Sequence, residues 1–530
     1  MLDLVFQGGT VVDGTGQPGR RADLGVADGR IAAIGDLSAA DARERVDVSG
    51  RVVSPGFIDI HTHSDVPLLV NPLAESKIRQ GVTTEVIGNC GFSPAPLQGP
   101  HAAALQQLSA LGAKGGKELD WSWQTFGEYL ERLSARRPAV NVVPLVGHVP
   151  LRAIAMGFDR RPPTAEEMDR MRGLLREALE AGAFGLSTGL VYPPSAYADT
   201  EELVELSRVA AEYQGYYFSH IRGEGHSLLR ATAEAIEIGE RAGVPVEIAH
   251  HKATFRPYYG RIRQAIRMSE EAQVRGQDVT FDVYPYTAGS SSLTQIIPDW
   301  AHEGGRARLL ERLANPADAA RIRADVVAQD REWDKTYVTW VASQKNKELE
   351  GLSLAQIAER RGIDPVDALF AVLQEEKAQA SMVHFCMSED DVRFVITHPL
   401  STIGSDGSSL APYGPLSEGK PHPRNYGTFP RVIQVYVREQ KAMPLEEAIR
   451  KMTGAPARKL RLGRKGLLRE GLDADLVVFD PATIRERGTY SDPHHYPEGI
   501  DYVVVNGQVA VRRGEHTGAQ AGRVIRRGEG

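Results

Sequence analysis

The sequence predicts an α/β fold, a TIM-type (β/α)8 barrel with a small β-sandwich domain built from both chain ends. Between about residue 57 and about residue 460, short apolar runs alternate with amphipathic helix-like runs such as TAEEMDRMRGLLREALEAG, which favours parallel βαβ units. The two chain ends instead carry short β-type runs separated by Gly and Asp-Gly turns. A length of 530 residues accommodates a large barrel and an accessory domain.

Eight apolar runs supply the strands that a barrel of this type needs: 57–63, 83–90, 141–148, 183–190, 215–220, 246–250, 279–286 and 401–406. A ninth run, SMVHFCM at 381–387, either displaces one of them or belongs to an insert. The competing fold is an open doubly wound sheet. We expect sandwich segments at 1–54 and 461–530 and a barrel at 55–460. Inserts near 97–137 and 297–347 either cover the barrel mouth or decorate the surface.

Composition excludes several classes of protein. There are 62 Lys and Arg against 69 Asp and Glu, a net charge of -7 without a long basic run, which disfavours nucleic acid and anionic lipid as partners. No run of about 18 apolar residues and no signal-peptide pattern occurs, so we expect a cytoplasmic protein without a membrane segment. Two cysteines exclude a disulfide-stapled scaffold. The expected partner is a small molecule, and the oligomeric state stays open.

The run FIDIHTH carries the first candidate metal ligands. Side chains alternate along a strand, so Asp59, His61 and His63 share one face. At the C-terminal end of a barrel strand, two such imidazoles can converge on one ion. An isolated His-x-His pair is more often a solvated or core pair, but the preceding Pro-Gly and the strand context favour a metal site here.

Further candidate ligands end three other strands. Cys90 closes TTEVIGNC, where a buried apolar thiol is the plain alternative to a metal thiolate. His220 ends GYYFSH and His250 ends VEIAH, which places both imidazoles on the same rim. Period-two alternation puts His251 on the opposite face, so we predict a structural role for it.

Asp406 ends the run STIGSD between Gly404 and Gly407. Asp-Gly is common in ordinary turns, and that alternative would prevail for the dipeptide alone. Its position in a metal-lined series favours a general base. His148 also ends a strand, which makes it a candidate to approach the site.

Eight motifs in this order resemble the amidohydrolase superfamily and, within it, the N-acyl-D-amino-acid deacylases, or D-aminoacylases. They are PGFIDIHTHSD, GVTTEVIGNCGFSPAP, GLVYPPSAYADTEEL, SHIRGEG, AHHK, FDVYPYTAGSS and HPRNYGTFPRV, with GSDG between the last two. The segment KMTGAPARKLRLGRKGLLREGLDADLVVFDP is similar to the C-terminal return into the sandwich that is shared across the superfamily.

The resemblance implies a zinc enzyme. Cys90, His220 and His250 match the ligands of a tightly bound zinc, and His61, His63 and Asp406 match a second, weaker metal position. No strand-borne lysine of the kind that becomes carbamylated in dihydroorotase-like relatives is evident, which argues against the cyclic-amide branch. The resemblance also implies that the substrate carboxylate is bound by Tyr192, Lys252, Tyr284, Ser290 and Arg424.

The function implied is zinc-dependent hydrolysis of the amide bond of N-acyl-D-amino acids, a linear C–N bond other than a peptide bond, with Asp406 as general base and acid. D-selectivity rests on the resemblance alone. Another amidohydrolase activity, on an L-acyl amino acid, a dipeptide or a cyclic imide, is the alternative within the enzyme class. A catalytically silent assembly protein is the alternative outside it.

Overall fold

A computed structural model describes residues 1–111, 116 and 119–529 of the chain. Its central sheet is parallel, and its strands follow one another around a barrel in chain order. These strands are β6 (Phe57–Asp59), β7 (Val82–Ile87), β8 (Asn141–Pro144), β9 (Val146–Gly147), β10 (Gly185–Gly189), β11 (Tyr216–His220), β12 (Val246–Ile248), β13 (Val279–Val283) and β17 (Ser401–Ile403). The predicted fold class is confirmed, and the open doubly wound sheet is wrong.

Two contacts close the barrel. Strands β8 and β9 are separated only by Leu145 and together form one barrel strand, which joins the order β6-β7-β8 to the order β9-β10-β11-β12-β13-β17. An isolated parallel bridge between Thr62 and Gly407 links the first strand to the last, with the His63 N–H donating to the Gly407 carbonyl at 2.8 Å. The loops that carry the candidate ligands therefore meet at the point of closure.

Amphipathic helices surround the barrel because each carries an apolar face, and some of them also have a side-chain cap at their start. In α6 (Ala165–Glu180) the Thr164 hydroxyl accepts from the Glu167 N–H, which forms a capping box, and the buried face includes Met171 and Leu175. The neighbouring helices are α4 (Phe126–Ala135), α5 (His148–Met156), α7 (Thr200–Glu212), α8 (Leu228–Ala242), α9 (Ile262–Val274), α14 (Glu389–Thr397) and α16 (Leu445–Met452). Among the described residues, no helix is long and apolar enough to cross a bilayer.

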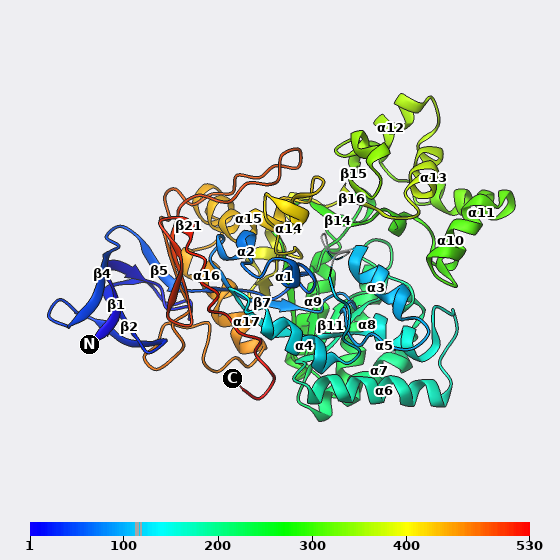
Figure 1. Ribbon diagram of the computed structural model, residues 1–530. Helices are drawn as coiled ribbons and strands as arrows, with labels where there is room; N and C mark the ends of the chain where they lie inside the picture. The colour runs from blue at the N-terminus through cyan, green and yellow to red at the C-terminus, as the bar shows by residue number, and fades with distance from the viewer. Residues whose placement is uncertain (112–115, 117–118, 530) are drawn as a thin grey trace.

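Strands from both chain ends form a second sheet outside the barrel, at the left of Figure 1. Strand β5 (Val52–Pro55) pairs antiparallel with β18 (Leu476–Phe479), so the two ends of the chain meet in one nine-stranded sheet. The other members are β1 (Leu2–Val11), β2 (Arg20–Ala27), β3 (Arg30–Gly35), β4 (Ala42–Asp47), β19 (Ile500–Val505), β20 (Gln508–Arg512) and β21 (Glu515–His516). Apolar side chains from both ends, such as Phe6 and Val504, fill its core.

A three-stranded antiparallel sheet and four helices interrupt the barrel between β13 and β17, at the upper right of Figure 1. The strands are β14 (Ala288–Ser292), β15 (Thr336–Val341) and β16 (Ala380–Phe385), and the helices are α10 (Arg306–Ala314), α11 (Pro316–Val327), α12 (Leu354–Arg361) and α13 (Pro365–Glu375). The run SMVHFCM is thus β16, an insert strand. The insert extends beyond 297–347 at both ends because β14 and β16 pair with each other and share a separate apolar core with the helices.

The expected insert at 97–137 contains α3 (Ala102–Leu111) and α4. Residues 112–115 and 117–118 of this range lie outside the described residues. Helix α3 reaches the larger insert, since the Arg306 Nη2 donates to the Gln107 Oε1 at 2.6 Å. The two inserts therefore meet at one side of the barrel mouth.

Candidate metal centre

The candidate ligands all stand at the C-terminal ends of barrel strands. His220 is the last residue of β11, and His250 follows β12 by two residues. Cys90 follows β7 and Asp406 follows β17, each by three residues. Because parallel strands end at the same rim, chemistry placed after each strand converges there.

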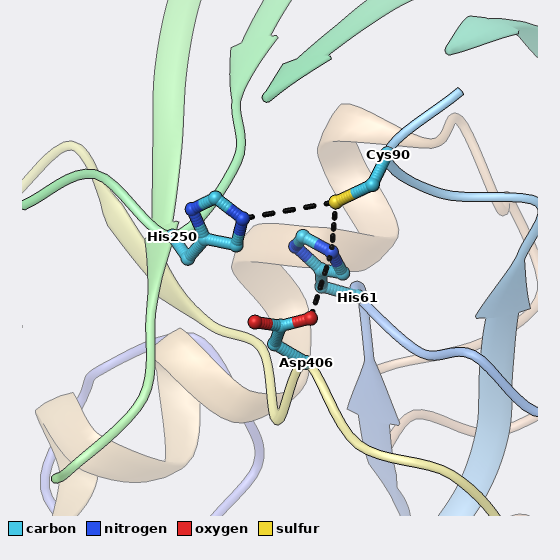
Figure 2. Close-up of side chains that lie close together, drawn as sticks. All are labelled: His61, Cys90, His250 and Asp406. Carbon is cyan, nitrogen blue, oxygen red and sulfur yellow. Dashed lines mark hydrogen bonds and ion pairs between the residues drawn. The ribbon is translucent and has the colours of Figure 1, made fainter. Parts of the chain in front are cut away.

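Four of these side chains point toward one another, as Figure 2 shows for His61, Cys90, His250 and Asp406. Their ligand atoms all lie within 4.8 Å of one another, and all four residues are buried. The His61 Nε2 lies 3.2 Å from the Cys90 Sγ and 3.5 Å from the Asp406 Oδ1. Nitrogen, sulfur and oxygen donors thus surround one small volume.

His63 and His220 extend this cluster on two sides. The His63 Nε2 lies 2.9 Å from the Asp406 Oδ1. The Cys90 Sγ lies 3.7 Å from both the His220 Nδ1 and the His250 Nε2. The structure therefore brings all six predicted ligand side chains together.

The distances from the Cys90 Sγ to the His220 and His250 nitrogens fit coordination of a shared zinc ion. Zn–S and Zn–N bonds of about 2.3 Å and 2.0–2.1 Å at a tetrahedral angle imply an S···N edge of about 3.6 Å. Both measured S···N distances are 3.7 Å. Thiol and imidazole donors also favour zinc over Mg²⁺ or Ca²⁺, which bind oxygen ligands.

The backbone turns sharply at three of the ligands. Cys90, His250 and Asp406 have φ angles of 52°, 34° and 50°, a left-handed region that non-glycine residues rarely occupy. Such conformations concentrate at functional sites, where the surrounding structure holds them. The backbone before Asp406 is held by close packing, since a Cβ atom at Gly404 would lie 2.7 Å from the His61 Cβ.

The electrostatics of the cluster suit a divalent cation. Burial raises the pKa of the Cys90 thiol, but His61, His220 and His250 offset this effect and lower that pKa well below its usual value. Burial also raises the pKa of Asp406, and the guanidinium of Arg424 and the neighbouring histidines lower it well below its usual value. A thiolate and a carboxylate in one buried site require positive charge beside them.

Two carboxylates, the buried Asp282 and the largely buried Glu224, orient the histidine ligands and were missed in the sequence. Asp282 on β13 lies 3.0 Å from the His61 Nδ1, and Glu224 lies 3.0 Å from the His250 Nδ1. A carboxylate on the other ring nitrogen fixes the tautomer that leaves Nε2 free to bind metal. Alternation within FDVYPY could have identified Asp282 as inward-facing, whereas no sequence signal pairs Glu224 with His250.

Two other histidines lie outside the cluster. His251 packs between strand β12 and helix α8, where its Nε2 lies 3.3 Å from the Thr232 Oγ1. His148 bonds the Ser195 hydroxyl at 2.8 Å through Nδ1 and Glu202 at 2.9 Å through Nε2. Ser195 belongs to the loop that begins at Tyr192, so His148 fixes that loop and does not reach the ligands.

A cavity of about 370 Å³ opens beside the cluster and is lined by His63, Cys90 and Asp406. Of the predicted carboxylate-binding residues, Tyr192, Ser290 and Arg424 line it. The Arg424 Nη1 lies 2.8 Å from the Asp406 Oδ2 as an ion pair whose direction is unfavourable for a hydrogen bond. The cavity has the size of a small-molecule site.

Lys252 and Tyr284 lie on the other side of His250. The Lys252 Nζ donates to Glu224 at 2.5 Å and lies 2.8 Å from the His250 Nδ1, so an internal carboxylate already neutralises this amine. The Tyr284 ring packs between the cations of Lys252 and Arg424, with 5.6 Å and 5.0 Å from each to its centroid. Among the described residues, the lining of the main cavity does not include these two side chains.

Comparison with known proteins identifies the family of the chain. The model of the Amidohydrolase family matches residues 44–511. The chain is 42% identical to a D-aminoacylase of Alcaligenes xylosoxydans xylosoxydans over 99% of this chain and 98% of that one. It is 40% identical to an N-acyl-D-glutamate deacylase of the same organism, over 99% and 97%. The crystal structure of N-acyl-D-glutamate deacylase from Bordetella bronchiseptica, complexed with zinc and a phosphonate inhibitor that mimics the tetrahedral intermediate, superposes with a TM-score of 0.84 at 38% identity, covering 99% of both chains. The chain therefore belongs to the amidohydrolase family.

Proposed function

We propose that this protein hydrolyses the amide bond of N-acyl-D-amino acids and releases a carboxylate and a free D-amino acid. The observation that carries the proposal is the cluster of one thiol, four imidazoles and one carboxylate, buried except for the partly exposed His63, that opens into a cavity with a guanidinium on its wall. The full-length similarity to a D-aminoacylase and to an N-acyl-D-glutamate deacylase supports the reaction and the D configuration.

The metal expected is zinc. Cys90, His220 and His250 would hold one ion tightly, and His61, His63 and Asp406 would form a second, weaker position. Zinc bound by such ligands supplies Lewis acidity, which polarises a carbonyl and lowers the pKa of water. Asp282 and Glu224 would keep the His61 and His250 rings in the tautomer that binds metal.

Asp406 is the proposed general base and acid. Its low pKa keeps the carboxylate ionised at neutral pH, so its oxygens can accept a proton. Asp406 takes one proton from water as the oxygen bonds to the acyl carbon. It passes that proton to the amide nitrogen as the C–N bond breaks, because a protonated amine is a far better leaving group than an amide anion. The products are the carboxylic acid and the amine, which at neutral pH exchange a proton and become the carboxylate and the ammonium form.

Arg424 is the proposed partner of the substrate α-carboxylate. Its guanidinium can form two parallel hydrogen bonds with a carboxylate, and Tyr192 and Ser290 add hydroxyl donors from the same cavity wall. Lys252 and Tyr284 would contribute to carboxylate binding indirectly, from behind the cavity wall, because the Tyr284 ring contacts the Arg424 guanidinium. A substrate carboxylate would also offer Arg424 an alternative to its ion pair with Asp406.

The remaining assignments are also proposals. We infer a barrel domain at 55–460 and sandwich segments at 1–54 and 461–530. A cytoplasmic location is in keeping with two cysteines that are both buried and unpaired with each other.

The deciding experiment measures amine release from paired N-acetyl-D- and N-acetyl-L-amino acids, with zinc quantified on the same sample. Release from D substrates alone by zinc-loaded protein is expected. Release from L substrates would point to an L-acylase, and zinc without release from any amide would point to a silent relative. Asp406→Ala should abolish nearly all turnover.

Cysteine variants supply a matched pair for the metal assignment. Cys90 and Cys386 are both buried free thiols, but at Cys386 the effect of burial outweighs the charges of Lys252 and Arg331 and raises the pKa to about 12. Cys90→Ser should lose bound zinc, and Cys386→Ser should retain it. Retention of zinc in both variants would contradict the proposed ligand set.

A further inference from the structure

The wall of the cavity carries a second cation that the proposed reaction does not use. Of the described residues that line the cavity, two are permanently charged bases, Arg424 and Arg306. Arg424 pairs with Asp406 beside the metal cluster. Arg306 begins helix α10 of the insert and contacts none of the cluster residues. The cavity therefore reaches from one guanidinium to the other.

Arg306 has no carboxylate partner among the residues that the structure describes. Its Nη2 donates to the neutral side chain of Gln107 at 2.6 Å, and its Nη1 is buried without any hydrogen-bond partner in the described parts of the chain. Burial lowers the pKa of Arg306, and no acidic residue within the described parts of the chain counters that effect. A partly buried guanidinium with a free donor is costly unless a ligand satisfies it.

The surroundings of Arg306 strengthen its attraction for an anion. The apolar side chains of Leu108, Phe158 and Leu309 also line the cavity and lower the local polarity. Gly305, the N-cap residue of α10, also lines the cavity, and no side chain caps this helix start. The positive end of the helix dipole therefore adds to the guanidinium charge.

We propose that Arg306 binds a second carboxylate of the substrate, so that the preferred substrates are N-acyl-D-amino acids with two carboxylates. This inference rests on the proposed function, in which Arg424 takes the α-carboxylate. The second carboxylate has two possible sources, an acidic amino-acid side chain or a dicarboxylic acyl group. Both present the same planar anion, which a guanidinium binds with two hydrogen bonds.

The test compares substrates of equal shape that differ in charge. For the side-chain source, the pair is N-acetyl-D-glutamate and N-acetyl-D-glutamine. For the acyl source, the pair is N-succinyl-D-leucine and its terminal amide. In the zinc-loaded wild type, kcat/KM should favour the charged member of one pair by about tenfold or more, since a hydrogen bond to a charged group is worth that much. The pair that shows this preference identifies the source.

Three variants connect that preference to Arg306. Arg306→Gln should reduce the charged-to-neutral ratio of kcat/KM to near one while activity on the neutral substrate stays within about twofold, which also shows that the variant folds. Arg306→Lys should retain part of the ratio. Gln107→Glu should lower it, because the new carboxylate would occupy the guanidinium. Arg308→Gln is the matched control, because Arg308 lies on the same helix but is exposed and ion-paired with Glu311. This variant should leave the charged-to-neutral ratio unchanged.

The outcomes separate this inference from the proposed function. Normal turnover of neutral D substrates, with no pair whose ratio depends on residue 306, overturns the role of Arg306 and leaves the deacylase assignment intact. Absence of turnover with every D substrate overturns the proposed function itself, and this inference with it.

Discussion

Replacing Asp282 is expected to weaken zinc binding without changing any ligand. The Asp282 carboxylate lies 3.0 Å and 3.2 Å from the His61 Nδ1 through its two oxygens, and neither side chain is exposed to solvent. These contacts hold the proton on Nδ1 and leave Nε2 to face Cys90 and Asp406. Without the carboxylate, the proton can move to Nε2 and block it.

The magnitude follows from the contacts that are lost. A hydrogen bond to a charged group contributes about 1.5–3 kcal/mol, and loss of a carboxylate behind a histidine ligand typically costs 10- to 100-fold in metal affinity. Asp282→Asn keeps an oxygen acceptor but loses the charge, so about a tenfold loss is expected. Asp282→Leu removes both, and a loss near 100-fold is expected.

The assay is competition between apo-protein and a chelator for zinc, with circular dichroism to verify the fold. Asp278→Asn is the matched control, because Asp278 precedes the same strand but its side chain is 53% exposed and forms an ion pair with Lys459 at 2.9 Å. That variant should bind zinc as the wild type does. If both Asp282 variants also bind zinc with wild-type affinity, the argument that Asp282 orients His61 is refuted.

Three other predictions concern neighbouring parts of the barrel. His250→Ala should lower the zinc content of purified protein, while His251→Ala should leave it unchanged, and a zinc loss from the second variant would reverse this assignment. Lys77→Met should destabilise the fold by about 3–5 kcal/mol in thermal unfolding because it leaves Asp59 buried and unpaired, and Lys77→Met combined with Asp59→Leu should recover most of the loss. Burial raises the pKa of Glu247 from 4.5 to about 8, so the folded state holds this proton more tightly and the wild type should lose stability as the pH rises between these values. The melting temperature of Glu247→Gln, relative to that of the wild type, should therefore rise from pH 5 to pH 8. A difference between the two melting temperatures that stays constant over this range would contradict the raised pKa.

The barrel strands could be predicted because each is a short apolar run with its own ends. Alternation within VEIAH separates His250 from His251, and the structure indeed turns the second ring toward Thr232. The run SMVHFCM could not be assigned from its pattern, because β16 looks like a barrel strand in isolation. Only its antiparallel pairing with β14 and β15 shows that it belongs to the insert.

The same limit applies to the residues around the candidate metal centre. Lys252 has the chemistry of a carboxylate binder, yet Glu224, 28 residues earlier, takes up its charge. Arg306 gives no signal in the sequence, since an arginine at a helix start is ordinary. That its partner among the described residues is the neutral Gln107 and not an acid becomes evident only where α10 meets α3.

The sequence by itself determined the barrel, the rim on which the chemistry stands and the residue types that gather there. These follow from local rules, because strand alternation fixes which side chains share a face and parallel strands end at a common edge. The tertiary structure alone decided which of those groups touch. His61 and Asp282 are separated by 221 positions in the chain and lie 3.0 Å apart in space. Such contacts depend on how distant elements pack together, and no local pattern records that packing.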